Sequence, residues 1–205
     1  MNLKQWFRQT SRELVSQGSS VSEQAGSDRS EPNLTTSVRT IRIFLASSAE
    51  LREDRDAFDL YFRQQNDRLR KQGLYLEITR WENFLDAMTN TRLQDEYNKK
   101  IRNCDIFVSL FKTKTGRYTE EEFGIAHHIF RETGKPLIYT YFEEATVSAS
   151  AINRRDLVSL WDFQEKLAEL GHFWTKYRSI DDLIKRFRDQ LDKLRDEGFD
   201  GKPFP

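Results

Sequence analysis

Cysteine is almost absent from this sequence of 205 residues, which contains only Cys104. A single cysteine excludes an intrachain disulfide framework and is typical of a reducing, cytoplasmic environment. No signal peptide is recognisable and no apolar run is long enough to span a bilayer, so no membrane partner is expected. The chain also lacks an excess of either charge, with 33 Lys and Arg against 33 Asp and Glu, which gives no support for a nucleic-acid partner. No repeat and no cluster of metal ligands is visible, so we predict neither a metal site nor a cofactor.

What the sequence does contain is enough for one domain with a sizeable core and an appendage. Residues 1–38 include a polar stretch rich in serine and glycine, and they are predicted to form a flexible N-terminal arm and linker. Residues 39–198 carry the regular apolar patterns of a folded domain. Residues 199–205 are predicted to form a C-terminal tail.

The domain alternates short apolar runs, typical of buried strands, with amphipathic helical patterns. The predicted strands are 41–46, 74–81, 105–111, 136–142 and 173–177, and the predicted helices are 48–70, 91–103, 119–133, 156–170 and 179–197. This order, with right-handed crossovers, predicts an α/β fold. We expect a flavodoxin-like three-layer sandwich with a five-stranded parallel sheet in the order 2-1-3-4-5.

In such a sheet, ligands bind beyond the carboxyl ends of the strands, where the strand order reverses. Here the crevice would open between the first and third strands, and Glu122 would lie at its rim. Two interpretations of Glu122 stay open at this point. With Thr119 it could form a capping box at the start of a helix, or it could be a carboxylate that serves a ligand site. Its neighbours Glu120 and Glu121 are expected to face solvent.

Local patterns also make predictions for the helices around this crevice. Ser47 and Glu50 have the spacing of a second capping box, and the same helix start is a good place for a phosphate. Arg55 falls on the apolar face of its helix, where it could pair with a carboxylate or, more commonly, snorkel to solvent. Trp161 is expected to point into the core with the leucines of its helix.

Three segments carry a resemblance to a known family. Ile43-Phe-Leu-Ala-Ser-Ser48 is similar to the family's opening strand, and Asn103-Cys-Asp-Ile-Phe-Val-Ser109 to its third strand. Tyr118-x-x-x-Glu122-Phe-x-x-Ala126, with Gly134-Lys135 before the next strand, resembles its catalytic stretch. In this order and spacing the chain resembles a bacterial Toll/interleukin receptor (TIR) domain.

The resemblance implies an NAD+ glycohydrolase that cleaves the nicotinamide–ribose bond, with NAD+ as substrate and no cofactor. It implies Glu122 as the catalytic residue. It also implies a set of substrate-binding residues along the crevice: Ala46, Ser47, Ser48, Trp81, Asn83, Phe84, Phe111, Lys112 and Tyr118. Further implications are self-association into an oligomer or filament, an activating partner protein or domain, and a role in bacterial antiphage defence in the cytoplasm.

Two alternatives of other kinds remain. A non-catalytic scaffold could use the same fold to signal by contact alone, in which case Glu122 is only a cap. An enzyme like the nucleoside deoxyribosyltransferases would also use a glutamate on a similar sheet, but on deoxynucleosides.

Overall fold

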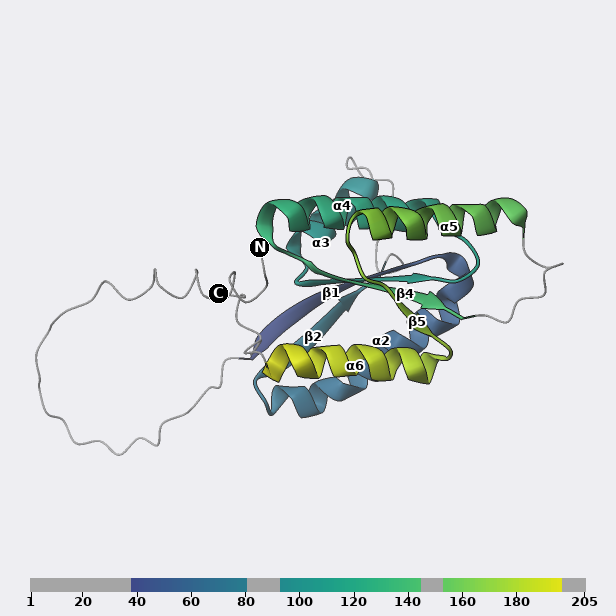
Figure 1. Cartoon of the computed structure of the whole chain (residues 1–205). Helices are drawn as coiled ribbons and strands as arrows, with labels where there is room; N and C mark the ends of the chain where they lie inside the picture. Colours follow the sequence, from purple (N-terminus) through teal and green to yellow (C-terminus); the bar gives the residue numbers. More distant parts are fainter. Residues whose placement is uncertain (1–37, 81–92, 145–152, 197–205) are drawn as a thin grey trace, which may run out of the picture.

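The computed structural model describes residues 38–80, 93–144 and 153–196 (Figure 1). The predicted arm, apart from Val38, and the predicted tail lie outside the described residues. So do three of the expected substrate-binding residues, namely Trp81, Asn83 and Phe84.

Five parallel strands form one sheet, and its order, β2-β1-β3-β4-β5, confirms the predicted flavodoxin-like α/β class. The strands are β1 (Arg39–Ser47), β2 (Leu74–Thr79), β3 (Ile106–Phe111), β4 (Leu137–Glu143) and β5 (Thr175–Tyr177). Since β1 and β3 pair through Ile43 with Ile106 and Ser47 with Leu110, the two strands end side by side. The crevice expected at the reversal of strand order is therefore bounded by these two ends.

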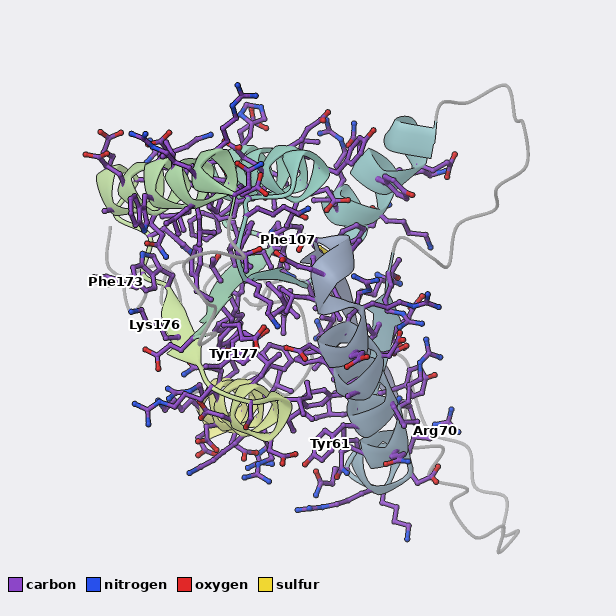
Figure 2. All side chains as sticks on the ribbon, turned by 90° about the vertical axis from the view of Figure 1, so that its right-hand side faces the viewer. Tyr61, Arg70, Phe107, Phe173, Lys176 and Tyr177 are labelled. Carbon is purple, nitrogen blue, oxygen red and sulfur yellow. The ribbon has the colours of Figure 1, made fainter. Side chains whose placement is uncertain are left out.

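Helices cover both faces of the sheet (Figures 1 and 2). One face carries α2 (Arg52–Arg70) and α6 (Ile180–Asp196), and the other carries α3 (Leu93–Asn103), α4 (Arg117–Thr133) and α5 (Arg154–Glu169). The side chains of β3 alternate between the two layers, because successive residues of a strand point to opposite faces. Ile106, Val108 and Leu110 pack into one core, and Phe107 and Phe111 into the other.

Buried polar contacts fix individual elements within these layers. The Asn66 side chain on α2 donates a hydrogen bond to the Leu76 carbonyl oxygen at 2.9 Å and accepts one from the Leu76 N–H at 2.8 Å. Tyr177 on β5 donates its hydroxyl to an oxygen of Asp54 at 2.6 Å, which ties the last strand to α2. Gly134 ends α4 with φ = 75°, a conformation that glycine adopts without strain.

One expectation about the core is wrong. Trp161 is 57% exposed, whereas Leu160, Phe163 and Leu167 of the same helix are buried. Spacings of three and four residues place these three on one helical face, and Trp161 falls outside it. Among the described residues, no helix is long and apolar enough to cross a membrane.

Candidate functional site

Figure 2 looks onto the edge of the sheet at which the strands end, where the crevice is expected. On one side, β1 ends at Ser47, and Ser48 then begins the short 3₁₀ helix η2 (Ala49–Leu51) that precedes α2. On the other side, β3 ends at Phe111, and a loop of five residues leads to α4. Side chains from the helices on both faces of the sheet can therefore reach the region between the ends of β1 and β3.

The start of α4 excludes one of the two interpretations of Glu122, the capping box. Gly116, not Thr119, is the N-cap, and the Glu120 N–H donates to its carbonyl oxygen at 2.9 Å. Thr119 is already inside the helix and buried, so the predicted capping box of Thr119 and Glu122 is wrong. A Cβ atom on Gly116 would lie 3.1 Å from Thr119 Oγ1 and 3.3 Å from the Ser48 Cβ, so glycine allows this loop to approach the turn after β1.

Glu122 lies in the second turn of α4 on its buried side and is only 5% exposed. Burial raises the pKa of its carboxyl from 4.5 to about 8, the charge of Glu121 adds to the rise, and the charge of Arg55 opposes it. Within the described part of the chain, no group donates a hydrogen bond to this carboxyl. Glu121 is exposed, as expected, and Glu120 forms an ion pair with Lys166 at 2.9 Å. Glu122 is therefore the one glutamate of the three that is directed inward.

Ser47 and Ser48 are both buried, and the predicted capping box of Ser47 and Glu50 is wrong, because Ser48 is the N-cap of η2 and no side chain caps this helix. Arg55 donates through Nη1 to Ser47 Oγ and, at 3.4 Å, to the Ser48 carbonyl oxygen. The Ser47 hydroxyl donates to the Ser48 carbonyl oxygen at 3.3 Å, and the Ser48 hydroxyl donates to Glu50 Oε1 at 3.1 Å. Because both hydroxyl protons are engaged, these oxygens are arranged to accept from a ligand hydroxyl rather than to donate to a phosphate.

Two further contacts tie the loop after β3 to its surroundings. Lys112 forms an ion pair with Glu143 on β4, with Nζ 2.9 Å from Oε2, and this hydrogen-bonded partner raises the lysine pKa. Glu50 accepts from the Thr113 N–H at 3.1 Å and from Thr113 Oγ1 at 2.5 Å. The positive charge of Lys112, one of the expected substrate-binding residues, is thus paired with a neighbouring carboxylate.

The remaining predicted binding residues are placed differently. Ala46 and Phe111 are buried in the core, where the Phe111 ring stacks on Phe142 with centroids 5.1 Å apart. Their side chains support the crevice from below and do not line it. Tyr118 is 68% exposed in the first turn of α4, one helical turn before the buried Glu122.

The sequence marked Arg55 as unusual but did not assign it to the site, and the structure shows it 0% exposed. The expected snorkelling is wrong, because its guanidinium contacts Ser47 and Ser48 under the turn after β1. The available signal was a charge inside the apolar stripe formed by Leu51, Phe58 and Phe62 of the same helix side. The described residues hold no group of three or more side chains that could bind a metal ion.

No protein-family model and no curated protein matches the chain. Among solved structures, it is similar to the CMP N-glycosidase BcmB of Clostridium botulinum, with a TM-score of 0.45 and 12% identity over 72% of this chain and 98% of that one. It is also similar to the RPS4 and RRS1 TIR domain heterodimer, with a TM-score of 0.44 and 14% identity over 75% of this chain and 96% of that one. Similarities at these values carry no conclusion about activity.

Proposed function

We propose that this protein hydrolyses the N-glycosidic bond of NAD+ between nicotinamide and ribose, with Glu122 as the catalytic residue. The observation that supports this most is the buried Glu122 carboxyl, which caps no helix and lies at the sheet edge where the strand order reverses. The resemblance of the surrounding stretch to the catalytic stretch of TIR domains points to the same residue.

The chemistry needs one carboxylate close to the ribose. Cleavage of the bond passes through an oxocarbenium-like transition state, and a nearby negative charge stabilises it. The nicotinamide ring of NAD+ is already cationic and leaves as a neutral molecule, so it needs no proton from the enzyme. Water then adds to the ribose carbon and releases one proton, which gives nicotinamide and ADP-ribose. Ser47 and Ser48 offer acceptor oxygens to ribose hydroxyls on the other side of the crevice.

The raised pKa of Glu122 predicts how this activity depends on pH. With a pKa of about 8, the free protein carries Glu122 mostly as the neutral acid at pH 7. If the carboxylate is the active form, kcat/KM for NAD+ should increase as pH rises, and level off above about 8. The cationic nicotinamide ring of the bound substrate favours the ionised carboxyl, so kcat should reach its plateau at a lower pH than kcat/KM.

The raised pKa of Glu122 also favours one second candidate, a hydrolase or transferase that acts on nucleosides or nucleotides with a neutral base. In these substrates the departing base must be protonated, and a neutral Glu122 acid could donate that proton at pH 7. Its rate should then decrease as pH rises through about 8, which is the opposite sign. Whether the rate rises or falls with pH therefore distinguishes the two reactions, although both depend on Glu122.

The test is to incubate the full chain with NAD+, a deoxynucleoside or a nucleoside monophosphate over a pH series and to separate the products by chromatography. Wild type is compared with Glu122→Gln and with Glu121→Gln, a matched control one residue away that is exposed. Consumption of NAD+ that rises with pH and requires Glu122 supports the proposal. Wild-type activity in Glu122→Gln would refute the catalytic assignment, and no turnover of any substrate would favour a scaffold that signals by contact.

We also propose that the enzyme works as an assembly. The Glu122 site lies at the edge of the sheet where the strand order reverses, and a neighbouring subunit or an activating partner could bind there and exclude water from the substrate. From the resemblance to bacterial TIR domains, we propose that such an assembly acts in antiphage defence. The corresponding observation would be turnover that rises more steeply than linearly with protein concentration.

A further inference from the structure

We infer that Arg55 is a positioning residue of the Glu122 site, which holds the turn after β1 and supplies positive potential to the Glu122 carboxyl. This inference rests on the proposed function of Glu122. Arg55 belongs to α2, on the opposite side of the sheet from α4, and so it completes the site from the other layer.

The first argument is the burial of a permanent charge. Arg55 is among the largest fully buried side chains of the described residues. Unlike a carboxylic acid or an amine, a guanidinium does not lose its charge when it is buried, so its desolvation must be compensated by hydrogen bonds and opposite charge. The surrounding stripe of Leu51, Phe58 and Phe62 would accommodate an apolar residue at this position without that cost. Stability alone therefore gives no reason for arginine here.

The second argument is what the guanidinium contacts. Nη1 donates to Ser47 Oγ, and the Ser48 carbonyl oxygen is 3.4 Å away. These are the last residue of β1 and the residue that begins η2, the two groups assigned above to the ribose side of the crevice. By binding both, Arg55 fixes the orientation of the Ser47 hydroxyl, whose proton points to the Ser48 carbonyl oxygen at 3.3 Å.

The third argument is electrostatic. The charge of Arg55 lowers the pKa of the Glu122 carboxyl, against the rise caused by burial and by Glu121. Among the described residues, these are the two charges that act on Glu122; the nearby cation Lys112 is held by Glu143. Without Arg55, an even smaller fraction of Glu122 would be ionised at neutral pH, and the proposed carboxylate mechanism would slow down.

The experiment uses the full-length chain with Arg55→Met, Arg55→Lys and the control Arg68→Met, an exposed position on the same helix. For each variant, we would measure the melting temperature, kcat and KM for NAD+ over a pH series, and the pH titration of the Glu122 carboxyl carbon by NMR. Arg55→Met should move the Glu122 titration upward by about one pH unit, since that is the effect of losing one nearby opposite charge. In Arg55→Lys, the Glu122 carboxyl should titrate at nearly the wild-type pH, because lysine keeps the positive charge. The kcat of this variant should be lower, because lysine lacks the planar fork of the guanidinium.

Each outcome decides the inference. A folded Arg55→Met with the wild-type titration and kcat overturns it. If Arg55→Met does not fold, Arg55→Lys decides, and wild-type kcat and KM in that variant overturn the positioning role. The NMR titration does not require turnover. A protein that consumes no NAD+ but shows the shifted titration refutes the proposed function and leaves the link between Arg55 and Glu122 intact.

Discussion

Replacing Glu122 with glutamine should make the protein more stable at neutral pH. Glutamine is nearly the same shape as the neutral acid and has no charge to lose. In wild type, the folded protein holds the Glu122 proton up to a pKa of about 8, whereas the unfolded chain releases it near 4.5. Between these two values the folded state binds more protons than the unfolded state, so the stability of wild type falls as pH rises.

The size of this effect follows from the two pKa values. Each pH unit between them costs wild type about 1.4 kcal/mol of folding free energy. Relative to a variant without this group, wild type is thus less stable by about 3 kcal/mol at pH 7 and by less than about 1 kcal/mol at pH 5. For a chain of this length, 3 kcal/mol corresponds to roughly 6–12 °C in melting temperature.

The assay is thermal unfolding of wild type, Glu122→Gln and Glu121→Gln at pH 5 and pH 7. The melting temperature of Glu122→Gln should exceed that of wild type by a large amount at pH 7 and by a small amount at pH 5. Glu121→Gln, which removes an exposed carboxylate from the same helix, should show little difference between the two pH values. An equal stability difference for Glu122→Gln at both pH values would show that the folded protein does not hold this proton, and the account of the site would be wrong.

Four other outcomes are expected. Glu122→Gln should lower NAD+ turnover by about 10²–10³-fold, and wild-type turnover should rise more steeply than linearly across a concentration series; strict proportionality in a proven monomer would contradict assembly. Deleting residues 1–37 should leave the melting temperature nearly unchanged in a calorimetric comparison, so a large fall would show that the arm belongs to the fold. Asn66→Asp should lower the free energy of unfolding by about 1–3 kcal/mol in urea titrations, because the new carboxylate cannot donate to the Leu76 carbonyl oxygen.

The sheet could be predicted because each strand is a short apolar run separated from the next by a clear helical pattern. β3, for example, is buried along its whole length, from Ile106 to Phe111, and this produces a continuous apolar run. Parallel pairing and right-handed crossovers then leave few arrangements, of which 2-1-3-4-5 is the one observed.

The details of the site were harder to predict because contacts between distant segments determine them. Thr119 has a side-chain oxygen that could cap a helix and Gly116 has none, yet Gly116 is the N-cap, at the point where the chain passes close to Ser48. Ser47 and Ser48 have the composition of a helix cap, but Arg55 and Glu50 occupy their polar groups instead. Local propensity contains no information about such partners, and the contribution of residues 81–92 to the crevice stays a prediction.

Arg55 and Glu122 make the strongest case that this edge of the sheet has a function. Each is a charged residue type on the buried stripe of a helix, where an apolar side chain would pack with less loss of hydration. If Arg55 and Glu122 were buried for unrelated reasons, nothing would require them to occur near one another. They belong to helices on opposite faces of the sheet, yet the charge of one acts on the carboxyl of the other at the point where the strand order reverses. Two costly residues that converge from separate layers on the predicted ligand site are better explained by selection for chemistry than by the needs of the fold.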